Sequence, residues 1–199
     1  HRTHEYLKGL FTDLGFAIRE FDGMPGFRAA ASEAAVVSPA GDSPRIALIA
    51  DMDALPVPGD EEGRYIHSCG HHMQMANLYG AARLLKESAS QALGHLTFMA
   101  VPAEEYIDFH RREPLRQSGA ISFLSGKQEL LHRGAFEGFD MVVSTHGSGL
   151  TDQRYIGSVH RLSGFEVLAF EFGGKAAHGG AAPHLGINAQ NAASLFLQA

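Results

Sequence analysis

The 199-residue sequence holds one cysteine and no tryptophan. A single cysteine cannot form a disulfide within the chain, so nothing points to an oxidising compartment and we expect a cytoplasmic protein. Lys and Arg total 16 against 22 for Asp and Glu, a formal net charge of −6. This charge excludes the basic footprint of a nucleic-acid-binding or anionic-membrane-binding domain. No apolar run approaches the roughly 18 residues that a membrane-spanning helix needs.

What the chain does contain is typical of a globular protein with a core. Apolar residues make up 45% of it and charged residues 19%. Twelve histidines are many for this length, and histidine is the commonest metal ligand. A helical pattern begins directly after His1, and the final strand, loop and helix cannot bury both of their faces alone. We therefore expect that the chain is cut from a longer one at both ends.

Alternating strand and helix patterns predict an α/β domain with a largely parallel sheet. Continuous apolar runs typical of strands buried on both faces occur at 45–50, 96–101 and 141–145. Further strands are expected at 16–21, 34–38 and 165–172, helices at 2–14, 73–88, 121–132 and 187–199, and a loop at 103–120. We expect one domain over residues 1–158 and the start of a second over 159–199.

The only cysteine lies in the segment His67-Ser68-Cys69-Gly70-His71-His72. In an extended segment Cys69 and His71 point to the same side and His72 points away. A thiolate and an imidazole on one side of a strand end or tight turn are two soft ligands for a transition metal such as zinc. The alternative is a buried cysteine beside surface histidines, because two ligands do not make a site.

Each of the three apolar strands is followed at once by acidic residues or a histidine. Asp51 and Asp53 follow the first strand, Glu104 and Glu105 the second, and His146 the third. In open α/β sheets ligands bind beyond the carboxyl ends of the strands, so these side chains are expected to meet. A mixed ligand set of this kind suits zinc, or manganese or cobalt less selectively. The predicted ligands are Cys69, His71, Glu105 and His146.

The remaining polar residues allow roles beside the metal. Neighbouring carboxylates diverge, so one of Glu104 and Glu105 can bind a metal while the other takes a proton from a metal-activated water and passes it to a leaving group. The alternative is a solvated acidic loop. Asp51 and Asp53 can fix the tautomer of a ligating histidine, or simply serve a turn. His178, in a glycine-rich turn, can donate to a developing oxyanion, or be a loop histidine without a role.

Several segments keep their order and spacing over nearly the whole chain and resemble one known family. They are Ala50-Asp51-Met52-Asp53-Ala54-Leu55-Pro56, His67-Ser68-Cys69-Gly70-His71, Pro102-Ala103-Glu104-Glu105, His146, Gly174-Lys175-Ala176-Ala177-His178 with Pro183, and Gly186-Ile187-Asn188-Ala189. Together they resemble the M20 family of metallopeptidases and amidohydrolases. The most similar branch is that of the N-acyl-amino-acid amidohydrolases, which includes hippurate hydrolases and plant auxin-conjugate hydrolases.

The resemblance implies an αβα catalytic domain, here residues 1–158, and an inserted ferredoxin-like lid that begins at 159–199 and mediates dimerisation. It implies two divalent metal ions, zinc, manganese or cobalt, and cleavage of the amide bond of N-acyl or N-aroyl amino acids or small peptides by a metal-activated water. The open alternatives are an inactive metal-binding fragment and a dipeptidase or aminopeptidase of the same family. The residues carried over are Cys69, His71, Glu105 and His146 as ligands, Glu104 as general base, and Asp53 and His178 as further catalytic residues.

One segment departs from the pattern of that branch. After Cys-Gly-His the branch continues with Asp-Gly-His, whereas this chain has His72-Met73-Gln74. The change removes a carboxylate and a histidine beside the predicted site, which bears on substrate choice and metal preference. The resemblance also implies that the family's second half of the lid and a later metal-binding histidine lie outside this chain.

Overall fold

The computed structural model describes residues 2–37, 44–107, 109–147, 157–159, 161, 163–164, 166, 168 and 170–198. By its contacts the chain divides into two compact units, residues 1–155 and 156–199. The first unit is built on a five-stranded sheet with the strand order β1-β2-β6-β3-β7. Its strands are β1 (Ala17–Glu20), β2 (Phe27–Ala30), β3 (Ile46–Asp51), β6 (Leu96–Val101) and β7 (Met141–Ser144).

The sheet is parallel where the predicted site residues follow its strands. β3 pairs in parallel with β6 on one side and with β7 on the other, while β1 and β2 extend the sheet in antiparallel fashion beyond β6. The carboxyl ends of β3, β6 and β7 therefore meet at one edge. The predicted α/β class with a largely parallel sheet is confirmed.

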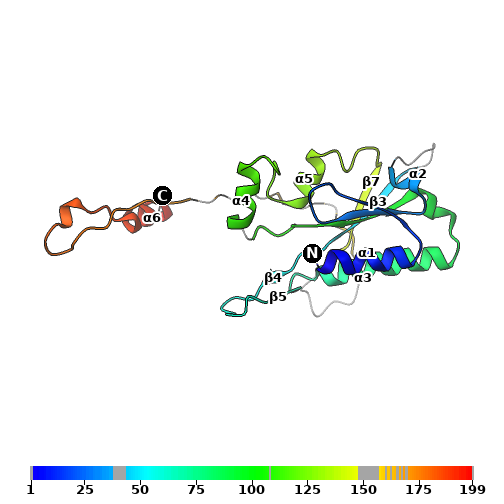
Figure 1. Ribbon diagram of the computed structural model, residues 1–199, viewed down its shortest axis with the longest axis horizontal. Helices are drawn as coiled ribbons and strands as arrows, with labels where there is room; N and C mark the ends of the chain where they lie inside the picture. The colour runs from blue at the N-terminus through cyan, green and yellow to red at the C-terminus, as the bar shows by residue number, and fades with distance from the viewer. Residues whose placement is uncertain are drawn as a thin grey trace. The chain divides into compact units, whose positions relative to one another are not determined.

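Helices cover both faces of this sheet (Figure 1). α1 and α3 lie on one face, where Phe11 and Leu78 join the sheet residue Phe98 in one apolar cluster. α5 lies on the other face, where Leu130 packs against Ile49 and Met99. The helices of the first unit are α1 (Arg2–Asp13), α2 (Glu33–Val37), α3 (His71–Glu87), α4 (Phe109–Gln117) and α5 (Gly126–His132), with a 3-10 turn at Gln91–His95.

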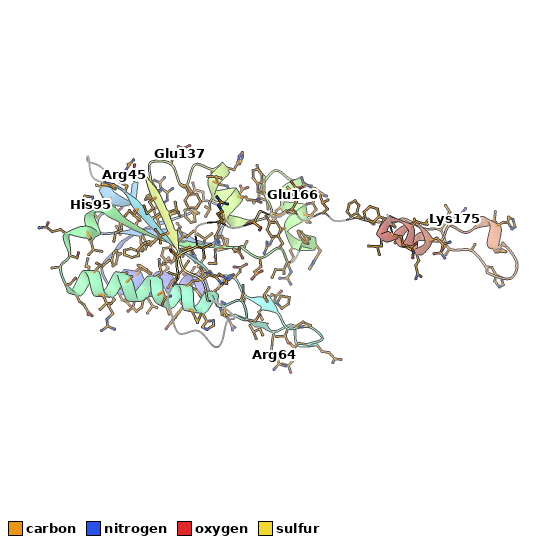
Figure 2. All side chains as sticks on the ribbon, turned by 180° about the vertical axis from the view of Figure 1, so that it is seen from behind. Arg45, Arg64, His95, Glu137, Glu166 and Lys175 are labelled. Atoms are coloured by element: carbon orange, nitrogen blue, oxygen red, sulfur yellow. The ribbon has the colours of Figure 1, made fainter. Side chains whose placement is uncertain are left out.

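A two-stranded hairpin, β4 (Leu55–Pro56) with β5 (Tyr65–Ile66), projects from the sheet after β3. Arg64 lies on this hairpin (Figure 2), and its guanidinium binds the carboxylate of Asp60 at 2.6 Å and 3.0 Å. Among the described helices, none is both long and apolar enough to cross a bilayer.

Three local predictions are wrong. The segment expected as a strand at 34–38 lies mostly in helix α2, because the Ser32 hydroxyl accepts a hydrogen bond from Ala35 N and caps it. The expected loop 103–120 contains helix α4. The strand at 141–145 is not buried, because β7 is the edge strand and all four of its residues are exposed. An apolar run identifies a strand without fixing how its faces are covered.

The second unit has little regular structure among its described residues. It contains a 3-10 turn at Pro183–Leu185, helix α6 (Ala189–Gln198) and a single β-bridge between Lys175 and Ile187. The ring of Phe196 on α6 lies 4.4 Å from that of Phe170. The described residues of the predicted strand 165–172 are not in a strand. A lid beginning near residue 159 stays a prediction.

Candidate metal centre

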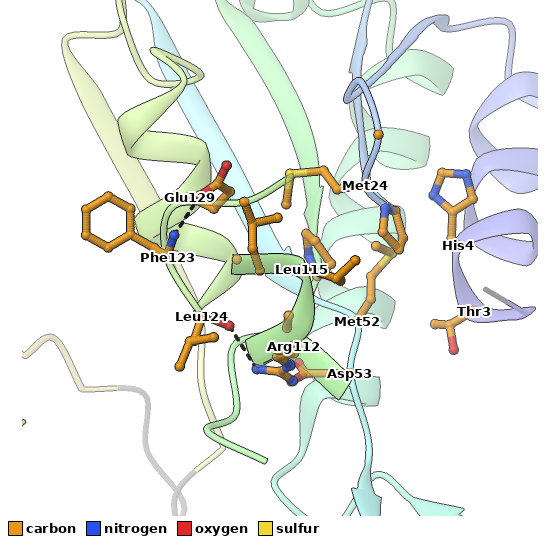
Figure 3. A pocket seen from close by; sticks show the side chains of 16 residues that line it. Thr3, His4, Met24, Met52, Asp53, Arg112, Leu115, Phe123, Leu124 and Glu129 are labelled. Atoms are coloured by element: carbon orange, nitrogen blue, oxygen red, sulfur yellow. Dashed lines mark hydrogen bonds between the residues drawn. The ribbon is translucent and has the colours of Figure 1, made fainter. Parts of the chain in front are cut away.

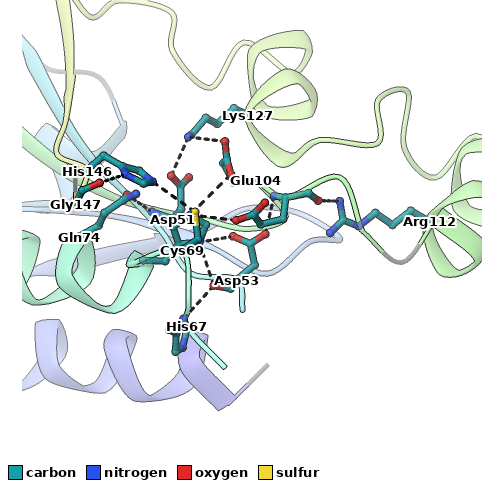
Figure 4. Close-up of polar contacts among 12 residues, drawn as sticks. Asp51, Asp53, His67, Cys69, Gln74, Glu104, Arg112, Lys127, His146 and Gly147 are labelled. Atoms are coloured by element: carbon teal, nitrogen blue, oxygen red, sulfur yellow. Dashed lines mark hydrogen bonds and ion pairs between the residues drawn. The ribbon is translucent and has the colours of Figure 1, made fainter. Parts of the chain in front are cut away.

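The predicted ligands gather at the carboxyl edge of the sheet, where Figure 4 shows Cys69 and His146. Cys69, His71 and His146 offer atoms that lie within 4.8 Å of one another, and His71, Glu104 and Glu105 do the same. Because His71 belongs to both groups, the two groups form one continuous cluster. The free Nε2 of His71 can serve one ion at a time, so a second ion would rely on the remaining residues of its group.

His71 is held by one ring nitrogen and offers the other. It is the first residue of α3 and is 1% exposed. Its Nδ1 lies 3.1 Å from the backbone oxygen of Asp53 and 3.1 Å from the Asp53 carboxylate. A carbonyl oxygen can only accept, so Nδ1 carries the proton and Nε2 has a free lone pair. Among the described residues Nε2 has no hydrogen-bond partner. A backbone carbonyl or carboxylate on the far nitrogen is how proteins orient metal-binding histidines.

His146 repeats this arrangement from the end of β7. Its Nδ1 donates to the backbone oxygen of Gly147 at 2.7 Å, which again leaves Nε2 as the acceptor. That Nε2 lies 3.6 Å from the Sγ of Cys69, and the ring is nearly perpendicular to the ring of His71. The Cys69 thiol therefore lies within reach of two imidazole lone pairs. Thiolate and imidazole together are the donor set that zinc prefers.

At Cys69 the chain forms a tight turn, which is one of the two conformations expected there, the other being a strand end. Residues 67–70 form a turn rather than an extended segment, and Gly70 has a φ of 88°, in the left-handed region that favours glycine. This turn places His71 at the start of α3 and brings Cys69 alongside it. The two side chains converge because of the turn and not because of strand alternation.

Glu104 and Glu105 follow β6 after a strained residue. Ala103 has a φ of 54°, which an alanine rarely adopts. Both carboxylates then lie 3.8 Å from Nε2 of His71. Glu105 N donates to the Asp53 carboxylate at 2.8 Å, so Asp53 orients both His71 and the loop that carries Glu105. Backbone strain of this kind concentrates at functional sites.

The electrostatics of the cluster favour a cation. Burial raises the pKa of the Cys69 thiol to about 11, and the Glu105 carboxylate adds to the effect. Burial also raises the pKa of Glu104, against the opposing influence of Lys127. Oε1 of Glu105 is buried without a hydrogen-bond partner among the described residues. A buried, unpartnered carboxylate oxygen beside a free imidazole nitrogen is costly unless a cation binds both.

Lys127 is the member of this site that sequence reasoning missed. Its ammonium lies 2.8 Å from the buried carboxylate of Asp51 and 3.8 Å from that of Glu104. α5 reaches this position because Gly126 packs against the backbone of Pro102, where a Cβ would collide with the carbonyl oxygen. Asp51 thus pairs with Lys127. Among the described residues, no hydrogen bond or ion pair joins Asp51 to a histidine that is predicted as a ligand. No motif marks Lys127, because only packing of α5 brings it to the cluster.

The departing segment 72–74 also contributes to the site. Gln74 is buried, and its side-chain oxygen accepts a hydrogen bond from Asp51 N at 3.0 Å. The amide therefore holds the end of β3, whereas His72 and Met73 are exposed. Gln74 carries an amide and no carboxylate, and it contacts the site through its hydrogen bond with Asp51 N.

His178 belongs to the second unit and is described there by itself. Its Nδ1 accepts hydrogen bonds from the backbone N–H groups of Gly180 and Ala181, at 3.2 Å and 2.9 Å. A neutral ring held in this way carries its proton on Nε2, so His178 presents a donor. This tautomer is the one that its predicted role toward an oxyanion requires.

A separate cavity of about 410 Å³ adjoins the cluster behind Asp53 (Figure 3). Its walls are mainly apolar and include Met24, Met52, Leu115 and Phe123. None of the predicted metal ligands lines it. The cavity is therefore a neighbour of the cluster and not the place where the candidate ligands meet.

Known proteins resemble this chain in sequence and in fold. The profile of "Peptidase family M20/M25/M40" matches residues 47–159. N-acetyl-L-cysteine deacetylase of Bacillus subtilis (strain 168) is 32% identical over 75% of this chain and 34% of its own length. N-acyl-L-amino acid amidohydrolase of Geobacillus stearothermophilus is 28% identical over 72% of this chain and 37% of its own. The chain thus spans about a third of the length of these relatives.

The fold has a counterpart among solved structures. A structure from methicillin resistant Staphylococcus aureus superposes with a TM-score of 0.51 and 20% sequence identity, covering 71% of this chain and 32% of that one. At this level of identity the likeness concerns the fold alone.

Proposed function

Because the chain belongs to peptidase family M20/M25/M40, we propose that it carries the metal-binding half-site of an amide hydrolase that acts on N-acyl amino acids or small peptides. The observation that carries the proposal is the pair of unpartnered, buried atoms Nε2 of His71 and Oε1 of Glu105, which face each other at 3.8 Å among the described residues. The names of the two relatives, a deacetylase and an amidohydrolase, support an N-acyl amino acid as substrate.

The residues present fit two divalent ions. Cys69 and His146 would hold one ion, Glu104 or Glu105 would approach the other, and His71 lies between the two groups. Ions bound here would polarise the scissile carbonyl and lower the pKa of the attacking water. Zinc matches the thiolate and imidazole ligands best, and manganese or cobalt matches the carboxylates.

Glu104 is the residue that this proposal assigns to proton transfer. Its carboxylate is 34% exposed, lies 3.8 Å from His71 and is raised in pKa by burial, so it can accept a proton from water and return it to the leaving amine. Glu105 is better fixed, because Asp53 binds its backbone N–H, and this favours it as the ligand. His178 would stabilise the oxyanion through its Nε2 proton. Assembly as a dimer and a cytoplasmic location stay predictions.

Metal binding and turnover are tested separately. Titration of the metal-free chain with Zn²⁺, Mn²⁺ and Co²⁺ by calorimetry should give saturable binding that Cys69→Ala and His71→Ala weaken by at least tenfold. Hydrolysis of N-acetyl amino acids is followed as release of the free amino acid. Glu104→Gln should bind metal like the parent and lose at least a hundredfold in kcat.

The controls distinguish an active amide hydrolase from an inactive metal-binding fragment. His72→Ala, an exposed neighbour of the ligands, should leave metal affinity unchanged. Tight metal binding without turnover by the parent chain would favour the interpretation that the chain is a metal-binding fragment. Turnover by Glu104→Gln at the parental rate would refute the role given to Glu104.

A further inference from the structure

Two arginines face each other on the antiparallel edge of the sheet. In the register of β1 and β2, Arg19 lies directly opposite Arg28. Side chains alternate along a strand, and the neighbours Ile18 and Phe27 pack into the cluster beneath α1 and α3. The two arginines therefore project from the opposite face, the one that α5 covers. Like charges placed directly opposite each other destabilise an antiparallel pair.

A third arginine reaches the same place from the end of α5. Arg133 donates to the Glu129 carboxylate at 2.5 Å and to the backbone oxygen of Asp22 at 2.6 Å. Arg28 in turn donates to the backbone oxygen of Ala135, just beyond α5. Between these groups lies a cavity of about 140 Å³. Its lining is Arg19, Glu20, Phe21, Asp22, Arg28, Leu130, Arg133 and Ala135.

The charged groups around this cavity are unevenly paired. Glu20 lines it but is bound by Lys8 at 3.0 Å and by His4 at 3.1 Å. Arg133 is already neutralised by Glu129. Lys8 is shared between Glu20 and Glu5. Among the described residues, neither Arg19 nor Arg28 forms an ion pair with a carboxylate, although Glu20 and Asp22 also line the cavity.

The arginines also keep unused donors. Nε of Arg28 is buried and, among the described residues, has no hydrogen-bond partner. Arg19 is exposed and makes no hydrogen bond or ion pair with any residue that the structure describes. Burial, followed by the charge of Arg19, lowers the pKa of Arg28. The cavity thus contains a buried donor and a repelling pair of cations, both of which an anion would satisfy.

We propose that this cavity binds one phosphate-type oxyanion, either free or as the terminal group of a small metabolite. Guanidinium groups match the oxygens of phosphate and carboxylate in a planar, forked geometry. At roughly 30 Å³ per water, the volume corresponds to about four or five waters, enough for one such group. The site is independent of the proposed metal centre, which lies at the carboxyl ends of β3, β6 and β7.

The test is thermal unfolding of the metal-free chain in EDTA, with potassium phosphate compared with potassium chloride at equal ionic strength. Phosphate at ten times its dissociation constant should raise the midpoint by about 3–6 °C, and the rise should saturate. Sulfate should reproduce the rise in the midpoint. A rise with acetate and not with phosphate or sulfate would indicate that the cavity binds carboxylates. Broadening of the phosphate ³¹P NMR signal by the chain gives a second, direct readout.

The decisive variant is Arg19→Gln, since Arg19 is exposed and its loss relieves repulsion in the free chain. It should fold with an unchanged or higher midpoint in chloride and lose the saturable phosphate shift and the ³¹P broadening. Arg83→Gln, on α3 at the other face, is the matched control and should keep both. The proposal is overturned if phosphate gives no saturable shift over chloride, or if Arg19→Gln responds like the parent.

Discussion

The ion pair between Asp51 and Lys127 should contribute substantially to the stability of the first unit. The Asp51 side chain is 3% exposed, and its second oxygen is buried without a hydrogen-bond partner among the described residues. Replacing Lys127 with Met would leave this carboxylate buried without the ammonium that lies 2.8 Å away. Removing one partner of a buried pair costs about 3–5 kcal/mol.

The expected loss lies at or just below the lower limit of that range. The Lys127 side chain is 34% exposed, so water can partly replace it in the variant. We expect Lys127→Met to lower the free energy of unfolding by about 2–3 kcal/mol. For a unit of this size the midpoint of thermal unfolding should fall by about 5–10 °C. Urea unfolding followed by circular dichroism, in EDTA, measures the change.

A surface pair provides the control for this measurement. Arg83 and Glu87 form an i,i+4 pair on α3 in which both side chains are more than half exposed. Arg83→Met should therefore cost no more than about 0.5 kcal/mol. A double-mutant cycle of Lys127→Met with Asp51→Asn should show that most of the loss is the interaction of these two residues. The reasoning is refuted if Lys127→Met is no more destabilising than Arg83→Met.

Two further predictions concern the cluster. Burial raises the pKa of Cys69 to about 11, so its thiol is protonated at neutral pH and must release its proton to bind a metal. Zinc affinity should therefore rise by up to tenfold per pH unit between pH 6 and 8. Calorimetry in buffers of different ionisation enthalpy measures the number of protons released on zinc binding, and Cys69→Ala should release fewer protons than the parent. Gly126→Ala should lower the free energy of unfolding by about 2 kcal/mol or more, because its Cβ would meet the carbonyl oxygen of Pro102; Gly80→Ala, with open space around it, is the control and should not destabilise.

The sequence was sufficient for the parts of the site that follow directly from a strand. Asp53, Glu105 and His146 each lie just beyond an apolar run, and parallel pairing of those runs brings them together whatever the details of the loops. Their convergence could therefore be predicted from order along the chain. The roles of these residues stay predictions that the experiments above address.

Packing between elements could not be predicted in the same way. Lys127 reaches Asp51 only because Gly126 lets α5 approach Pro102. No sequence pattern predicts such a contact for a lysine in the first turn of a helix. On α3 the polar residue Gln74 is buried, whereas its apolar neighbour Met73 is exposed. The buried face of a helix depends on the way the helix packs across the sheet. The spacing of apolar residues predicts that face only loosely when small and polar residues lie among them.

The same packing explains why a cation would stabilise the cluster. Asp51, Asp53, Glu104 and Glu105 bring four carboxylates to one sheet edge, and Lys127 is the ammonium paired with them among the described residues. Lys127 is committed mainly to Asp51, 2.8 Å away, and lies farther from Glu104. The carboxylates of Asp53, Glu104 and Glu105 are thus left without a close cation, and all three lie beside the ring of His71. Lys127 therefore balances the charge of Asp51, and the metal that we propose would balance the charge of the other carboxylates.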